Sequence, residues 1–406
     1  GKDNVTYVPW LLTALTVCST PPGSSFAPVT NNDLGASYPS ITAALNAASA
    51  GHTIEAHNNT GVPGIFTEDL VIDKANIKLQ SENGSSLTTL QLENGVGIDI
   101  QGGADGFILG GSLNQGFTIN DGAATTFAVQ LSNAPSGVNI SDNSIVLDDN
   151  ASMGISVGAA GASGLTIADN TFTVGDGDGA IWGPEVSGLT VSDNIFNTNG
   201  DTQQNSGYAI EFSGVSGTST IENNIINHYA NGIFILNGSG TIAPDILNIK
   251  CNTIANGING IRFGEYSTVG PGNMENINIQ WNTMTNNDVG LLIGDGAHVT
   301  ADNFTIEYNN FNNPGGNNAG LQNDNSAATV DATYNYWGSD KGPKIKSNST
   351  GKGDRNTGTY EENVTYITWV NEFINCGDTP PFNITDEGPV KNNTQGTSKY
   401  TIQDAI

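Results

Sequence analysis

Short apolar stretches with a two-residue period recur between Val138 and Trp337, and each ends in an asparagine. Apolar residues at alternate positions predict a β-strand with one buried face. We expect each asparagine to turn the chain at a corner, since asparagine tolerates a left-handed backbone better than most residues. These asparagines, 24 to 30 residues apart, are Asn143, Asn170, Asn194, Asn224, Asn252, Asn282, Asn309 and Asn335.

Each repeat also holds a second apolar strand, as at 154–157, 209–212 and 260–263. A repeat of about 20–50 residues that contains strands indicates a solenoid or a propeller. Propeller blades and leucine-rich repeats fit less well, because their strand pattern or helix content differs. The sequence therefore predicts an all-β parallel β-helix solenoid whose asparagines stack about 4.8 Å apart and hydrogen-bond along the stack.

The organisation along the chain follows from where this pattern starts and stops. A helix is expected at 39–51, where Ile41, Ala44, Leu45 and Ala48 share one face and Gly51 can end it. Such a helix would cap the apolar column. The predicted parts are an N-terminal cap and assembly segment (1–37), a β-helix of roughly twelve coils (38–337), a basic loop (338–362) and a C-terminal segment (363–406).

The two ends of the chain repeat each other. Residues 363–381 match residues 4–22, which aligns Trp10 with Trp369 and Cys18 with Cys376. The chain then ends on the opening of a second capping helix. Three interpretations stay open: excision from a tandem array, docking of the tail on the next molecule, or a disordered tail. We favour assembly, because open strand edges invite pairing and repeated ends permit head-to-tail contacts. The start at Gly1 indicates a processed or shortened product.

Three cysteines leave one unpaired within a single chain. A Cys18–Cys376 bridge, within or between chains, is an option in an oxidising compartment. Cys251 directly precedes its ladder asparagine, and we expect it to be a packed free thiol.

Charge excludes some partners. Forty acidic residues against twelve basic ones give a net charge of −28, which argues against nucleic-acid binding because phosphates need a basic stripe. It suits a soluble surface that attracts cations or basic partners. No apolar run is long enough to predict membrane insertion. Five bases concentrate in one loop, which is either a solvated connector or a contact for an acidic surface: Lys341, Lys344, Lys346, Lys352 and Arg355.

Candidate chemistry lies on the second strand of each repeat. The expected outward column contains Ser156, Ile181, Glu211, Phe234, Arg262 and Leu292. Arg262 should lie two rungs, about 10 Å, from Glu211. This constellation is too sparse for a lyase or hydrolase, so no catalytic residue is predicted. Ile181, Phe234 and Leu292 would form an apolar stripe that a loop or a neighbouring molecule covers.

Metal and glycan sites are weakly indicated. Asp176, Asp178 and Asp295 lie in glycine turns and offer oxygen ligands for calcium, although such turns are usually only turns. We predict no cofactor and leave a structural calcium ion as an option. Among the N-x-S/T sequons, those outside the regular coils are the better candidates for glycosylation: Asn4, Asn348, Asn363, Asn383 and Asn392.

A family resemblance spans residues 38–343. Four segments resemble right-handed parallel β-helix proteins of the pectin-lyase-like superfamily, in particular the repeat-bearing surface proteins of methanogenic archaea and some bacteria. These segments are YPSITAALNAASAGHTIEA, GIFTEDLVIDKANIKL, ISDNSI and ATYNYWGSDKGP. The resemblance implies the fold, whereas function varies because this fold hosts lyases, hydrolases, epimerases and structural proteins. With its duplicated ends, the chain resembles the sheath proteins of filamentous methanogens.

The sequence thus predicts an extracellular structural glycoprotein, a surface layer or sheath, that polymerises through head-to-tail and lateral contacts with copies of itself. The alternative is a secreted β-helix protein that binds or cleaves acidic polysaccharide near Glu211 and Arg262. The candidate assembly residues are Trp10, Cys18, Ile181, Phe234, Leu292, Lys341, Lys344, Lys346, Trp369, Cys376, Ile402 and Ile406.

Overall fold

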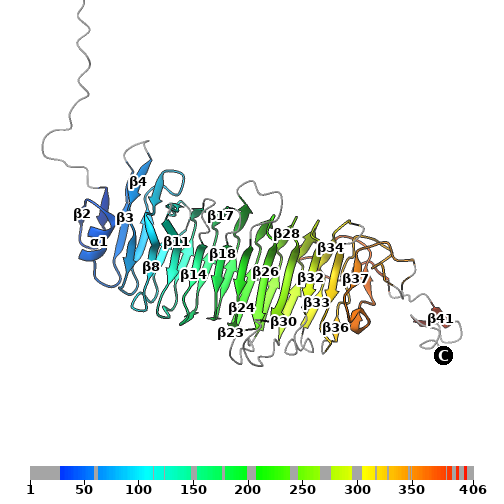
Figure 1. The fold of residues 1–406 in the computed structure, drawn as a ribbon. Coiled ribbons are helices and arrows are strands. Elements are labelled where there is room, and N and C mark those ends of the chain that lie inside the picture. Colours follow the sequence, from blue (N-terminus) through cyan, green and yellow to red (C-terminus); the bar gives the residue numbers. More distant parts are fainter. Residues whose placement is uncertain are drawn as a thin grey trace, which may run out of the picture.

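The computed structural model is an elongated parallel β-helix, in which three long sheets run the length of the body (Figure 1). The structure describes residues 28–58, 63–112, 114–122, 124–147, 153–175, 179–198, 207–237, 246–265, 276–294, 304–315, 318–326, 329–345, 348, 350–380, 382–385, 390–392 and 397–399.

In the regular part of the body each turn of the chain contributes one strand to each sheet. In spatial order, sheet A contains β2 (Ala36–Tyr38), β1 (Val29–Asn31), β3 (Thr53–Ala56), β6 (Lys78–Ser81), β9 (Ile108–Gly110), β12 (Asn139–Ser141), β16 (Thr166–Ala168), β20 (Thr190–Ser192), β24 (Thr218–Glu222), β27 (Ile246–Lys250), β30 (Ile277–Gln280), β33 (Phe304–Glu307), β36 (Val330–Asp331) and β38 (Val364–Thr365). At the N-terminal end the antiparallel strands β1 and β2 extend this sheet.

Sheet B follows the asparagine corner. It contains β4 (Gly64–Thr67), β7 (Thr88–Gln91), β10 (Thr118–Asn120), β13 (Ser144–Val146), β17 (Thr171–Val174), β21 (Ile195–Thr198), β25 (Ile225–Asn227), β28 (Thr253–Ala255), β31 (Thr283–Thr285) and β34 (Asn310–Asn312).

Sheet C completes each turn. It contains β5 (Leu70–Ile72), β8 (Asn94–Ile100), β11 (Ala124–Leu131), β14 (Met153–Val157), β18 (Gly179–Gly183), β22 (Tyr208–Phe212), β26 (Asn231–Asn237), β29 (Asn259–Glu265), β32 (Val289–Ile293), β35 (Ala319–Asn323) and β37 (Arg355–Thr357).

The remaining described elements are short. They are a three-stranded ladder of β15 (Ala162–Ser163), β19 (Val186–Ser187) and β23 (Val215–Ser216), the pairs β39 (Trp369–Val370) with β40 (Ile384–Thr385) and β41 (Val390–Asn392) with β42 (Thr397–Lys399), the 3-10 turn η2 (Glu361–Asn363) and the helix α1 (Ile41–Ala47).

The class of fold was predicted correctly, but the number of coils was not. The asparagine ladder spans eight turns, and the described part of sheet B has ten strands, so roughly twelve coils is too many. β37 pairs with β35 and β38 pairs with β36. The last coil is therefore built partly from the segments 338–362 and 363–406, which the sequence analysis placed outside the β-helix.

The apolar interior is a set of stacked columns. Ile140, Ile167 and Val191 lie in register on neighbouring strands of sheet A, and all three are fully buried. On sheet B, the rings of Phe172 and Phe196 stack with their centroids 4.8 Å apart. Because like residues repeat at each rung, side chains of one shape pack on each other, which supplies the main favourable term for folding.

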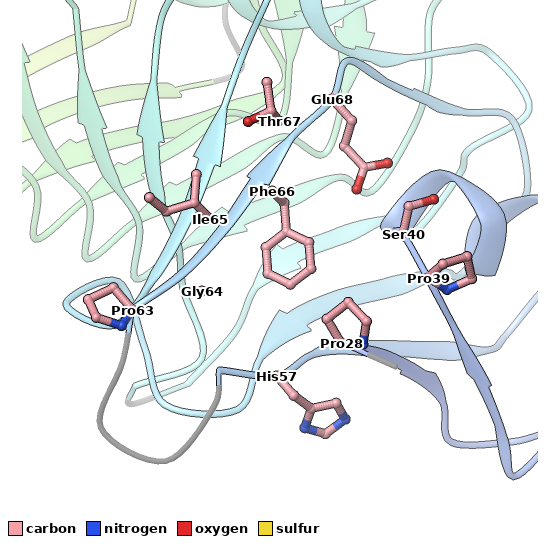
Figure 2. A pocket seen from close by; sticks show the side chains of 10 residues that line it. All are labelled: Pro28, Pro39, Ser40, His57, Pro63, Gly64, Ile65, Phe66, Thr67 and Glu68. Carbon is pink, nitrogen blue, oxygen red and sulfur yellow. The ribbon is translucent and has the colours of Figure 1, made fainter. Parts of the chain in front are cut away.

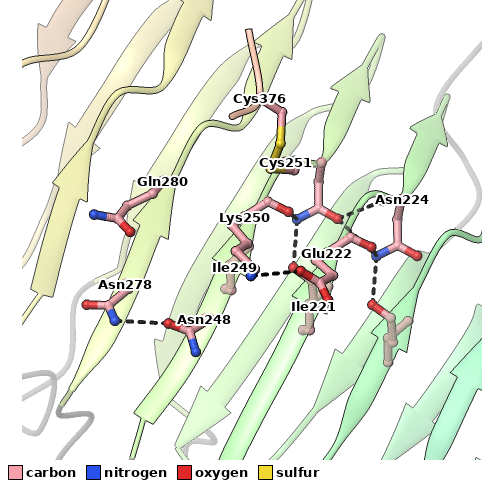
Figure 3. Close-up of polar contacts among 12 residues, drawn as sticks. Ile221, Glu222, Asn224, Asn248, Ile249, Lys250, Cys251, Asn278, Gln280 and Cys376 are labelled. Atoms are coloured by element: carbon pink, nitrogen blue, oxygen red, sulfur yellow. Dashed lines mark hydrogen bonds and ion pairs between the residues drawn. A yellow bond between two sulfur atoms is a disulfide. The ribbon is translucent and has the colours of Figure 1, made fainter. Parts of the chain in front are cut away.

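The predicted asparagine ladder is present and buried. The amide nitrogen of Asn194 donates to the backbone oxygens of Ile167 and Ser192, both at 2.9 Å, and to Oδ1 of Asn224 at 3.0 Å. Its own Oδ1 accepts from the backbone and side-chain nitrogens of Asn170. Each asparagine within the ladder therefore satisfies backbone groups of its own coil and of the preceding coil, and it bonds to the side chain of the asparagine in the following coil (Figure 3).

The reason given for these asparagines needs correction. The left-handed residue at each corner is the one before the asparagine, for example Asp193 at φ 58°, Trp281 at 56° and Tyr308 at 60°. This kink turns the next side chain inward beneath the corner. Asparagine is required there because its amide both donates and accepts, whereas the strained position takes cysteine, tryptophan or tyrosine.

The N-terminal helix caps the column as expected, although it ends at Ala47 and does not reach Gly51. Ser40 caps its first turn by accepting from the backbone nitrogen of Ala43. The carboxylate of Glu68, from the first coil, accepts from the backbone nitrogens of Ile41 and Thr42 at 2.8 and 2.9 Å. The described residues include no helix long and apolar enough to span a membrane.

The disulfide joins Cys251 to Cys376, so the expected free thiol at Cys251 and the Cys18–Cys376 bridge are both incorrect (Figure 3). Their Cα atoms lie 5.2 Å apart although 125 residues separate them in sequence. The C-terminal segment folds back over the ladder corner, where Ile374 exchanges hydrogen bonds with the Asn310 side chain. This return of the chain is what brings Cys376 to Cys251. Cys18 lies outside the described residues.

The ladder yields a stability prediction. Asn194→Ala removes the partners of several buried backbone groups and should lower the free energy of unfolding by about 3 kcal/mol or more. Asn197→Ala is the matched control, because Asn197 lies three residues further on, in β21, and its side chain is not buried, so the change should cost less than about 1 kcal/mol. Denaturant unfolding followed by circular dichroism measures both, and equal losses would contradict a special role for the ladder.

The disulfide gives a second prediction. Peptide mapping without reductant should recover Cys251 linked to Cys376. Cys376→Ser should make residues 371–385 more sensitive to protease while the β-sheet signal is retained, because the bridge ties down an edge segment and not the core. Recovery of a Cys18–Cys376 peptide from the monomer would refute this pairing.

Candidate functional site

The outer face of sheet C carries one mixed column of aromatic, charged and apolar side chains. The strand register aligns Trp182 with Glu211, Glu211 with Phe234, Phe234 with Arg262, and Arg262 with Leu292. All five are partly exposed. We call these five residues the sheet C column. The sequence analysis predicted Glu211, Phe234, Arg262 and Leu292 at these positions. It did not predict Trp182.

Ile181 was assigned to this column incorrectly. It is fully buried and pairs with Ile155 and Ile210 inside the core. The error is a shift of one residue, which moves a side chain from one face of a strand to the other. The correction matters chemically, because it replaces an aliphatic side chain on the outer face with an indole.

Glu211 is the carboxylate of this column. Burial raises its pKa to about 7, while a hydrogen bond from the Trp182 side chain and the charge of Arg262 act in the opposite direction. Burial and, to a lesser extent, the Glu211 charge raise the pKa of Tyr208, which begins the same strand. Glu211 is therefore a partly buried carboxyl that changes charge near neutral pH.

Arg262 lies over an aromatic ring. Its guanidinium carbon is 4.5 Å from the centroid of Phe234, which is a cation–π arrangement. Its buried Nε has no hydrogen-bond partner, and one rung beyond Trp182 the hydroxyl of Ser156 is also buried without a partner. These polar atoms are two hydrogen-bonding positions next to an aromatic surface that the protein itself leaves unused.

A separate pocket of about 570 Å³ lies at the N-terminal end (Figure 2). Pro28, Pro39, Pro63 and Phe66 form its apolar wall. Its polar side chains already have structural partners: Glu68 binds the start of α1, and His57 bonds to Thr30 and Glu82 at 2.8 and 3.1 Å. We therefore assign this pocket to the packing of the cap.

Several predicted assembly residues are used within the chain. Trp369 is buried and donates from its indole nitrogen to the backbone oxygen of Asp340, and Cys376 is in the disulfide. Lys341 forms an ion pair with Asp340, while Lys344 is exposed. Trp10, Lys346, Ile402 and Ile406 lie outside the described residues.

The candidate glycosylation and metal-binding residues also differ in their exposure, and some lie outside the described residues. Asn348 is buried and donates to the backbone oxygens of Lys341 and Pro343, so its side chain is not accessible to a glycan. Asn383 is exposed, Asn363 is half-buried, and Asn392 lies in β41. No group of three acidic, histidine or cysteine side chains suited to a metal occurs among the described residues. Asn4, Asp176, Asp178 and Asp295 lie outside that part of the chain.

Two features escaped the sequence analysis. Trp182 was missed through the register shift described above. Asp354, a buried carboxyl at the C-terminal end, accepts from the backbone and side-chain nitrogens of Asn313 at 2.7 and 2.8 Å. It ends a second, shorter asparagine ladder through Asn287 and Asn313. No sequence signal marked it, because the repeat pattern had already stopped at Trp337.

Comparisons with known proteins bear on the fold alone. No family model and no curated protein matches the chain. Two solved structures with similar folds are mutant tailspike proteins of E. coli bacteriophage HK620 in complex with a pentasaccharide, each 12% identical, with TM-scores of 0.40 and 0.43. They cover 73% and 80% of this chain, which spans only 58% and 62% of theirs.

A third similar structure is a hyperthermoactive exopolygalacturonase from Thermotoga maritima, 11% identical, with a TM-score of 0.31. The match covers 69% of this chain and 82% of that one. At these identities and TM-scores the likeness decides nothing about this chain, whose fold and chemistry follow from its own strand pairing and residues.

The raised pKa of Glu211 gives a titration prediction. The pKa of Glu211 is higher in the folded protein than in the unfolded chain, so the folded protein binds more protons than the unfolded chain between about pH 4.5 and 7. The stability that this group contributes is therefore lost as the pH rises through about 7. Tryptophan fluorescence should change with a midpoint near pH 7, since Glu211 bonds to Trp182. Glu211→Gln should abolish that transition and Glu222→Gln should keep it. A transition that persists in Glu211→Gln would rule out this assignment.

Proposed function

We propose that this protein is a secreted parallel β-helix protein that binds an acidic polysaccharide on the outer face of sheet C. The observation that carries the proposal is the sheet C column, in which two aromatic side chains, a carboxyl and a guanidinium follow one another along the helix axis. The Cys251–Cys376 disulfide agrees with an oxidising, extracellular compartment.

The geometry of the column suits an extended chain of sugars. Adjacent rungs are about 4.8 Å apart, so Trp182, Phe234 and Leu292 present apolar surface over about 19 Å along the axis. Apolar faces of sugar rings can pack on such surface while polar groups of the sugar meet the partly exposed side chain of Arg262. A repeating ligand would therefore meet an apolar side chain at every second rung.

The charges favour an acidic ligand. A guanidinium binds carboxylates through paired hydrogen bonds, and Arg262 is the cation of this column. Glu211 lies two rungs away and opposes an anionic ligand when ionised. Its raised pKa reduces that opposition at and below neutral pH, so binding should strengthen as pH falls through about 7.

Among the described residues, the column supports binding more directly than cleavage. Glycoside hydrolysis ordinarily uses two carboxylates about 5–9.5 Å apart. In the outer column of described strands, the next carboxylate to Glu211 on the N-terminal side is Asp99, four rungs away. At about 4.8 Å per rung, this separation is near 19 Å. The test of binding below therefore also measures cleavage.

Self-assembly into a surface layer or sheath is the weaker proposal. Three of its contacts have other roles, since Ile181 is in the core and Trp369 and Cys376 bind within the same chain. Phe234 and Leu292 belong equally to the proposed sugar-binding face. A polysaccharide surface thus accounts for more of the observed positions.

The proposal predicts selective loss of binding. Trp182→Ala and Arg262→Gln should each weaken binding of polygalacturonate about tenfold or more, because they remove a stacking surface and the cation. Lys250→Gln is the matched control: it also removes one positive charge, but from sheet A, where Lys250 pairs with Glu222 at 2.9 Å. Calorimetry at fixed ionic strength measures affinity, and chromatography of the ligand detects cleavage.

Two results would count against the proposal. Binding that is equally weak in Lys250→Gln and Arg262→Gln would indicate general electrostatics and not a site. Absence of binding to acidic and neutral polysaccharides alike, by well-folded protein, would remove polysaccharide binding as the function.

A further inference from the structure

A small cavity at the C-terminal end of the β-helix gathers positive charge. It has a volume of about 220 Å³ and lies where the last corner between sheets B and C meets the chain after Trp337. Its charged lining is Lys344, Lys352, Arg355 and Asp354. We call this cavity the C-terminal pocket. It holds three of the twelve basic residues of a chain with net charge −28.

The backbone holds these cations together. Lys344 and Arg355 face each other in a parallel bridge, and the backbone nitrogen of Lys344 donates to the backbone oxygen of Asp354 at 3.0 Å. Arg355 begins β37, the last strand of sheet C, so its position is fixed by the register with Ala319. Two like charges on adjacent strands repel each other unless an anion lies between them.

The carboxylate in the pocket is already engaged. Asp354 is buried, and its Oδ2 accepts hydrogen bonds from the backbone and side-chain nitrogens of Asn313. Burial raises its pKa to about 6 against the opposing effect of these hydrogen bonds. Within the described residues, neither Lys344 nor Lys352 forms an ion pair. The two lysines therefore retain their charge for a ligand.

We propose that the C-terminal pocket binds an oxyanion, either a free sulfate or phosphate ion or the acidic group of a single sugar. Lysine and arginine side chains that converge on one cavity form charge-assisted hydrogen bonds with such groups. The volume admits a small ligand and not an oligosaccharide. None of the residues that line the pocket belongs to the sheet C column, so this site is tested independently of the proposed function.

The test uses the full chain and three probes at low ionic strength and pH 7.5: sulfate, phosphate and monomeric galacturonate, with glucose as the neutral comparison. Calorimetry should show one saturable site for at least one anion and none for glucose. The variant Lys344→Gln/Lys352→Gln should weaken binding about tenfold or more, because two exposed side chains are changed without affecting the core. Lys341→Gln, a charge lost outside the pocket lining, should leave the affinity within about twofold.

A gain-of-binding variant separates the site from surface charge. In Asp354→Asn, the amide oxygen should still accept from Asn313, as the ladder asparagines do, while the negative charge disappears. Anion affinity should then rise about three- to tenfold at pH 7.5. Binding of sulfate or phosphate alone supports the site and identifies a free oxyanion, whereas binding of galacturonate supports it and identifies an acidic sugar.

The proposal is overturned if the wild-type protein shows no saturable binding of any of the three anions. It is also overturned if Lys341→Gln weakens binding as much as the double variant, or if Asp354→Asn folds normally without raising the affinity. None of these three outcomes depends on whether polygalacturonate binds to sheet C.

Discussion

The structure depends on a column of buried asparagine amides. Side-chain amides are among the few groups that can donate and accept at once, and each one here completes the hydrogen bonding of a corner that strands cannot complete themselves. A corner without such a group would leave backbone nitrogen and oxygen atoms buried and unsatisfied at every turn. The ladder thus fixes where each coil bends, and with it the register of sheets A and B across eight turns.

Register at the corner determines chemistry on the surface. Once the coils are aligned, the outward residues of sheet C also align, although nothing in their own sequence forms a repeat. Trp182, Glu211, Phe234 and Arg262 share no residue type, yet they form one column because each precedes an inward residue of the same core layer. A repetitive interior therefore supports a non-repetitive exterior, which is how a solenoid carries a specific site.

This difference between a repetitive interior and a non-repetitive outer face determines how much of the structure the sequence predicts. The interior repeats, so its strands, its ladder and its capping helix can be recognised from the sequence alone. The outer column required the register of each strand, which two glycines obscure. Gly154 is the second residue of β14, whereas Gly179 is the first residue of β18 and pairs with Met153. Aligning the two glycines exchanged Ile181 for Trp182. The disulfide and the C-terminal pocket depend on chain return over long sequence distances, for which local patterns hold no signal.

The charge of the molecule appears at first to oppose an acidic ligand, because the net charge is −28. Screening resolves this conflict: at physiological ionic strength the field of a charge decays over about 8 Å, so a ligand on one face senses the groups within that distance rather than the whole protein. Within that distance of the sheet C column, Arg262 lies on an aromatic ring and Glu211 bears a carboxyl whose charge burial disfavours. The remaining acidic surface slows the approach of a polyanion without weakening its contacts once bound, since long-range charge acts mainly on association rates. An acidic β-helix can therefore hold an acidic polymer, provided that its few cations are concentrated where the ligand lies.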